Sequence, residues 1–138
     1  MQPSIESATL NHLAALRPAL VNRVAEELAA SLPPINASVR DLGSEAHHHE
    51  RMYSTAERFH EMLLAAVLAD WGMVAFEYGW AARVLRPLGV TWEHQERLIQ
   101  SYFATARELT AWDEDELAAL AALEQQVLAT CGPIYAAN

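Results

Sequence analysis

The stretch SEAHHHERMYSTAERFHEMLLAAVLA, residues 44–69, decides the fold class. Its apolar residues recur at steps of three and four, which is the period of one face of an α-helix. This apolar stripe consists of Met52, Ala56, Phe59, Leu63, Ala66 and Val67. Ser44 is a suitable N-cap residue, and Asp70-Trp71-Gly72 marks the end of the pattern. The stretch therefore predicts one long amphipathic helix over about 44–69.

The helical period continues on the N-terminal side of this stretch, over about residues 4–32. Pro18 interrupts the pattern, because proline lacks a backbone N–H and breaks or kinks a helix. We therefore expect a break near Leu16–Arg17 and an end at Pro33-Pro34.

Further helices are predicted over about 72–87, 92–110 and 114–131 on the C-terminal side. Thr91 can cap the second of these, and Asp113 with Glu116 forms a capping-box pattern before the third. Gly132-Pro133 predicts the end of the last helix and a loose tail after it. No strand pattern is present, so the sequence predicts one all-α domain over residues 1–138 with five to six helices.

Composition excludes several functional classes. The chain has a formal net charge of −9, which disfavours binding to nucleic acid and to anionic membranes. It has no apolar run of about 18 residues and a single cysteine, Cys131, so no internal disulfide can form. We expect a cytoplasmic protein.

The middle of the chain resembles the phycobiliprotein branch of the globin superfamily. The matching strings are Leu68-Ala69-Asp70-Trp71-Gly72, Glu77-Tyr78-Gly79 and Leu88-Gly89-Val90. The resemblance implies a globin-like helical domain that holds a bilin. It also implies subunit pairing through the first helices, so a homodimer is expected.

The site of covalent bilin attachment in this family is not preserved. Alignment places Arg51 at the position of the attachment cysteine, and Tyr53 and Ser54 replace the Arg-Asp pair that follows it. A thioether link at that site is impossible here. The pattern is closer to that of a globin relative associated with bilin biosynthesis, with any bilin held non-covalently.

The run His47-His48-His49-Glu50 is the most conspicuous local feature. On a helical projection, His49, Tyr53 and His60 share one flank of the apolar stripe, and His47 points outward. The other flank carries Arg51 and Arg58. Imidazoles can coordinate a haem iron or bind pyrrole nitrogens, and arginines can hold propionates. The alternative interpretation is a run of partly exposed polar residues at a helix start.

Glu77 is unusual because it falls within an apolar arc set by Met73, Trp80, Ala81 and Val84. A buried carboxylate needs a partner or a proton, so Glu77 either contacts pyrrole N–H groups, pairs with an arginine, or reaches solvent at the rim. The expected cofactor-binding residues are His48, His49, Arg51, Met52, Tyr53, Arg58, Phe59, His60, Glu77 and Trp80. His49 is the expected metal ligand if the cofactor is haem.

The leading hypothesis is a tetrapyrrole-binding globin that carries or senses a bilin such as biliverdin, or haem. The alternative is a ligand-free sensor or interaction module. A third option is a corrinoid-binding bundle, suggested by Trp80 and Glu93-His94. An enzyme is not expected, because no serine or cysteine nucleophile stands beside a histidine at a useful helical spacing and no glycine-rich phosphate loop is present.

Overall fold

The computed structural model describes residues 5–33 and 45–137, which form six α-helices and one short 3-10 helix. The helices are α1 (Ser7–Ala15), α2 (Arg17–Ser31), α3 (Glu45–Leu68), α4 (Gly72–Leu85), α5 (Trp92–Leu109) and α6 (Glu114–Ala137), with the 3-10 helix η1 (Arg86–Leu88) after α4. The described ranges contain no strand. The prediction of an all-α domain with five to six helices is confirmed.

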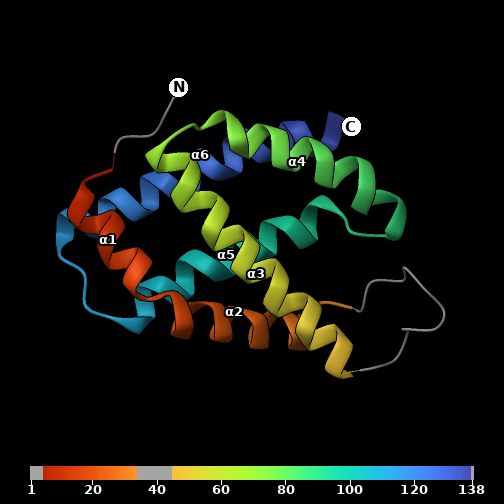
Figure 1. The fold of residues 1–138 in the computed structure, drawn as a ribbon, viewed down its shortest axis with the longest axis horizontal. Helices are drawn as coiled ribbons and strands as arrows, with labels where there is room; N and C mark the ends of the chain where they lie inside the picture. Colours follow the sequence, from red (N-terminus) through yellow and green to blue (C-terminus); the bar gives the residue numbers. More distant parts are fainter. Residues whose placement is uncertain (1–4, 34–44, 138) are drawn as a thin grey trace.

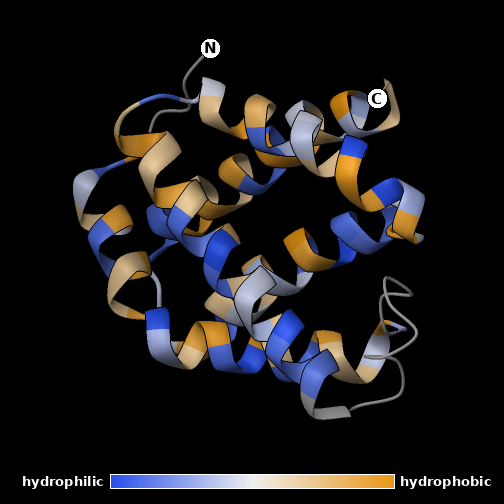
Figure 2. Cartoon of the chain, turned by 45° about the vertical axis from the view of Figure 1, so that its right-hand side comes forward, coloured by the Kyte–Doolittle hydropathy of each residue, from blue (hydrophilic) through white to orange (hydrophobic). Residues whose placement is uncertain are grey.

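The helices α3 and α5 cross in the middle of the molecule, between α2 along one side and the pair α4 and α6 along the other (Figure 1). Each helix alternates hydrophobic and hydrophilic segments, as expected for helices with one buried face (Figure 2). The core is made of side chains that are almost completely buried, among them Leu13, Leu20, Leu63, Ile99, Phe103 and Leu120. Burial of each such side chain contributes about 1.5–3 kcal/mol to stability.

The predicted break near Leu16–Arg17 lies where the structure changes from α1 to α2. Leu16 ends α1, and Pro18 occupies the first turn of α2, where its missing N–H costs no helical hydrogen bond. The expected cap at Ser44 lies outside the described residues.

Two short turns join α3, α4 and α5. Asp70 Oδ1 accepts a hydrogen bond from the Gly72 backbone N–H at 2.9 Å, which fixes the turn into α4. Gly89 follows η1 with φ of 90°, a left-handed conformation that glycine adopts without steric cost. Thr91 then caps α5 as predicted, with its hydroxyl accepting from the His94 N–H and its own N–H donating to His94 Nδ1.

The predicted inner face of α4 is only partly right, because Val74 is buried and Ala81 packs against the core as expected but the larger residues of the set are exposed. Met73, Trp80 and Val84 were expected inside, but they are 38%, 39% and 41% exposed. The buried residues of α4 are Val74, Tyr78, Gly79 and Ala82. The reason is that α4 packs mainly on α6, and the small residues Gly79 and Ala82 allow close approach of the two helices.

The predicted end of the last helix at Gly132-Pro133 is also wrong, because α6 continues to Ala137. Pro133 cannot donate to the carbonyl of Ala129, yet tertiary contacts hold the next turn. Tyr135 is 1% exposed, and its hydroxyl donates to the backbone carbonyl of Val90. A buried side chain and its hydrogen bond therefore outweigh the local helix-breaking signal.

Helix α6 is the one described helix that is long and apolar enough to cross a membrane by length and composition alone. Core helices of soluble proteins meet the same criterion. The buried face of α6, which includes Leu120, Leu123 and Val127, packs against the other helices.

Candidate ligand-binding groove

An open groove of about 490 Å³ lies between α3 and α4, with α5 at its floor. We call it the α3–α4 groove. Its lining residues are His47, Glu50, Arg51, Ser54, Thr55, Arg58, Phe59 and Met62 of α3, Glu77, Tyr78, Trp80, Ala81 and Leu85 of α4, and Gln95 and Leu98 of α5.

The spacing of residues along the two helices explains how they form the walls. On α3, the groove side follows His47, Arg51, Ser54, Arg58 and Met62, at steps of three and four. This row is the arginine-bearing flank of the apolar stripe. On α4, Glu77, Ala81 and Leu85 recur every four positions, and Tyr78 and Trp80 lie beside this row, so one side of each helix faces the groove.

Arg58 is the central polar residue of the groove. Its guanidinium donates from Nη2 to Glu77 Oε2 at 3.0 Å and from Nε to the same oxygen at 3.2 Å. Its Cζ lies 5.1 Å from the ring centroid of Trp80, so the cation also stacks on an aromatic face. Arg58 therefore links the charged and aromatic parts of the wall. It also gives Glu77 the arginine partner that the sequence analysis named as one alternative.

The deeper wall is apolar. Phe59, Tyr78 and Leu98 are each 5% exposed or less. Burial raises the pKa of the Tyr78 phenol well above its usual value, because desolvation disfavours the phenolate. The hydroxyl of Tyr78 is therefore neutral at physiological pH. Planar apolar groups can pack against this wall without contacting a buried charge.

A smaller pocket of about 80 Å³ adjoins the groove. The two cavities share four lining residues, namely Thr55, Leu85, Gln95 and Leu98. The remaining wall of the smaller pocket includes Leu28, Leu32, Met52, Leu88, Val90 and His94. The two cavities are therefore adjacent, separated by the four shared side chains.

Five of the ten residues predicted to bind a cofactor line the α3–α4 groove: Arg51, Arg58, Phe59, Glu77 and Trp80. Met52 lines the smaller pocket instead. The structure thus brings the arginine flank, the glutamate and two aromatic residues together around one cavity.

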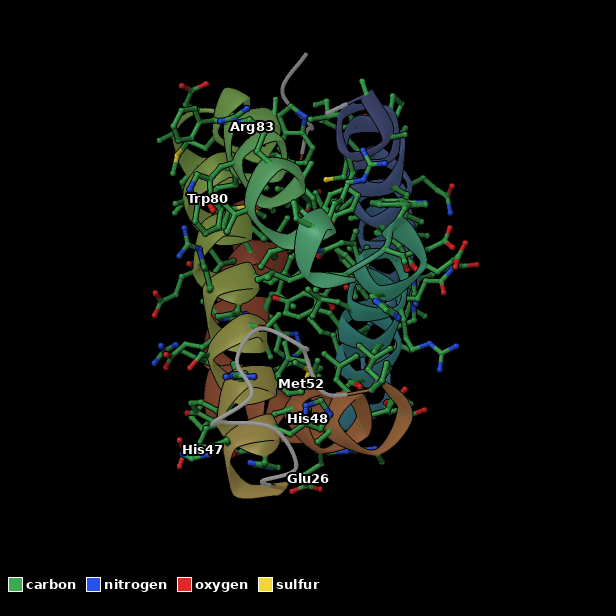
Figure 3. All side chains as sticks on the ribbon, turned by 90° about the vertical axis from the view of Figure 1, so that its right-hand side faces the viewer. Glu26, His47, His48, Met52, Trp80 and Arg83 are labelled. Atoms are coloured by element: carbon green, nitrogen blue, oxygen red, sulfur yellow. The ribbon has the colours of Figure 1, made fainter. Side chains whose placement is uncertain are left out.

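The predicted histidine flank does not reach the groove. His49 is exposed and Tyr53 packs against the core, and neither lines the groove. His48 is 7% exposed, with Nε2 2.9 Å from the backbone carbonyl of Leu32 at the end of α2. Figure 3 shows His48 and Met52 directed towards α2, whereas His47 lies on the outer side of α3.

His60 is a core residue. It is 1% exposed, its Nδ1 lies 2.6 Å from the hydroxyl of Tyr102, and its Nε2 has no hydrogen-bond partner among the described residues. Burial, assisted by the nearby positive charge of Arg17, lowers the pKa of His60 to about 4. The ring is therefore neutral at physiological pH. It belongs to the packing of α3 on α5 and offers no ligand atom to the groove.

Sequence reasoning missed several groove residues. His47 is exposed on the outer side of α3 as expected, yet it also belongs to the groove-lining row that continues through Arg51 and Arg58. Following that row by steps of three and four would have found it. Gln95 and Leu98 come from α5, and no local pattern indicates that these residues form the floor.

The described residues contain no group of three or more His, Cys, Asp or Glu side chains that could hold a metal ion. Comparisons of the chain with protein-family models, with curated proteins and with solved structures found no match.

Proposed function

We propose that the α3–α4 groove binds a tetrapyrrole non-covalently, a bilin such as biliverdin in preference to haem, and that the protein carries or senses this pigment. The observation that carries the proposal is the meeting of two arginines, Arg51 and Arg58, with an aromatic and aliphatic wall around one cavity. An open-chain tetrapyrrole has the matching features, which are a flat apolar body and two carboxylates.

The size of the groove supports a ligand of this class. Pockets that hold drug-sized ligands and cofactors commonly measure about 300–1,000 Å³, and the groove measures about 490 Å³. The pyrrole rings would pack against Phe59, Tyr78 and Trp80. The propionates would lie at the guanidinium groups, which bind carboxylates through paired hydrogen bonds.

Exchange of partners at Arg58 allows such a ligand to bind. The side chains of Arg58 and Glu77 are 62% and 29% exposed, so their ion pair is solvated on one side. An exposed ion pair contributes about 0–1 kcal/mol to stability. Replacement of Glu77 by a ligand carboxylate therefore costs little, and Glu77 is then available to accept from pyrrole N–H groups.

The distribution of histidines favours a bilin over haem. Among the described groove residues His47 is the only histidine, and it lies in the exposed first turns of α3. His49, the expected iron ligand, is outside the groove. Haem binding would gain from an axial imidazole, whereas a bilin needs none.

Titration with biliverdin and with haem, followed by visible absorption, tests the proposal. We expect a sharpened, red-shifted biliverdin band that is lost on denaturation in acid, since no covalent bond forms. Arg58→Ala should weaken binding about 10-fold, the loss expected for a charge-assisted hydrogen bond. Arg97→Ala is the matched control, because Arg97 is exposed on α5 and outside the groove. Unchanged spectra with both pigments, or equal losses in the two variants, would contradict the proposal.

The interaction-module alternative has one specific observation in its favour, the exposed apolar side chains of α4. It predicts unchanged pigment spectra together with self-association or partner binding. The corrinoid alternative gains no such support, because His94 Nδ1 is occupied by the Thr91 N–H in the cap of α5.

A further inference from the structure

Helix α4 carries an apolar face that the described residues leave partly exposed. Six large apolar side chains are exposed among the described residues, and four of them lie on α4. These four, which we call the α4 stripe, are Met73, Phe76, Trp80 and Val84, with Phe76 73% exposed. Their steps of three, four and four residues place them on one face of the helix. Leu68, 72% exposed, lies just before this helix.

We propose that a second copy of this chain packs against the α4 stripe as a symmetric antiparallel pair. In an antiparallel pair with its two-fold axis near residue 78, the numbers of two facing residues add up to about 156. This places Phe76 of one copy opposite Trp80 of the other. The same axis sets Met73 opposite Val84. The stripe is thus complementary to itself, as a two-fold interface requires.

The charge distribution favours α4 over other faces for self-association. Two copies with a net charge of −9 each repel one another. Between residues 72 and 88, however, Glu77 is the only acidic residue, while Arg83 and Arg86 are basic. Arg58 also neutralises Glu77 within each copy. The repulsion is therefore weakest where the apolar surface is exposed.

The apolar area of the stripe suits a reversible dimer. Aromatic side chains present about 150–250 Å² each when fully exposed, so the exposed fractions of the stripe and Leu68 amount to roughly 400–500 Å² per copy. With polar rims, two such surfaces approach the roughly 1,200 Å² at which specific interfaces begin. The first helices, the pairing surface that the family resemblance implies, contribute none of the exposed large apolar side chains.

Light scattering coupled to size exclusion tests this pair without any ligand, so its outcome is separate from that of the pigment titration. We expect a concentration-dependent dimer. Phe76→Glu should raise the dissociation constant at least about 30-fold, as for a central interface residue. Leu117→Glu is the matched control, because Leu117 is 40% exposed on α6, away from the stripe, and it should leave the dimer intact. A wild-type monomer at several hundred micromolar, or a dimer unaffected by Phe76→Glu, would overturn the proposal.

Cysteine cross-linking tests the antiparallel register. A mixture of Met73→Cys and Val84→Cys chains should form a disulfide-linked heterodimer under mild oxidation, while Met73→Cys alone should not. The native Cys131 is buried and its thiol pKa is raised by desolvation, so it does not compete. Efficient self-linking of Met73→Cys would indicate a parallel pair and overturn this register.

Discussion

Replacement of His60 by glutamine should make the stability of this fold less sensitive to acid between pH 7.5 and pH 5. In the native protein the pKa of His60 is lowered from 6.5 to about 4, mainly by burial and secondarily by Arg17. Protonation would also put a proton on both ring nitrogens, so that Nδ1 could only donate to the Tyr102 hydroxyl and Nε2 would carry a buried N–H without a partner among the described residues. The native state therefore excludes a proton that the unfolded chain accepts.

The sign and size of the effect follow from this difference. Well above pH 6.5, as at pH 7.5, the ring is almost entirely neutral in both states and contributes almost no pH dependence. As the pH falls from 6.5 towards 4, only the unfolded state binds the proton, so the free energy of unfolding decreases. Integration from pH 7.5 to 5 with these two pKa values gives a loss of about 2 kcal/mol.

Urea denaturation followed by circular dichroism at pH 7.5, 6.5 and 5.0 measures the change. The glutamine side chain can still hydrogen-bond Tyr102 but does not titrate, so the slope of stability against pH should become shallower in His60→Gln. His49→Gln is the control, because His49 is exposed and should keep the wild-type slope. Parallel slopes for wild type and His60→Gln would refute the reasoning.

The remaining predictions concern the last turns of α6 and the turn at Gly89, each measured as a change in the free energy of unfolding. Pro133→Ala should stabilise the protein by about 1–3 kcal/mol, because it restores a helical N–H to the Ala129 carbonyl; a destabilised variant would contradict this. Gly89→Ala should cost about 1 kcal/mol although no atom lies within 4 Å of the added Cβ, since φ is +90°; no loss would show that the left-handed turn is not strained. Tyr135→Phe should cost about 1 kcal/mol through loss of the hydrogen bond to Val90, and an unchanged midpoint would exclude that bond as a stabilising contact.

The sequence predicts those parts of the fold that are set by residues within one helical turn of each other. Pro18 separates α1 from α2, and Asp113 and Glu116 form the predicted reciprocal cap, with Glu116 N–H 2.8 Å from Asp113 Oδ1. Such signals act within one helical turn, so they need no knowledge of the rest of the chain.

The parts that the sequence does not predict depend on partners distant in the chain. The burial of Gly79 and Ala82, in place of the larger Trp80, follows from the approach of α6 to α4. On α3 the projection grouped Arg51 with Arg58, and both line the groove. Which flank faces a cavity, however, depends on α2 and α5, which cover the side that bears His48 and His60. Arg58 was therefore a better guide to the groove than the more conspicuous histidine run.

The last turn of α6 is tied to the floor of the groove. Arg86 Nη1 donates to the Tyr135 carbonyl at 3.2 Å, and the Tyr135 side chain hydrogen-bonds Gln95, a groove residue. A truncation ahead of Tyr135, or a fused domain that strains this turn, would therefore disturb the floor of the α3–α4 groove, although the altered turn lies on α6. Expression tags intended to be silent belong at the opposite end of the polypeptide.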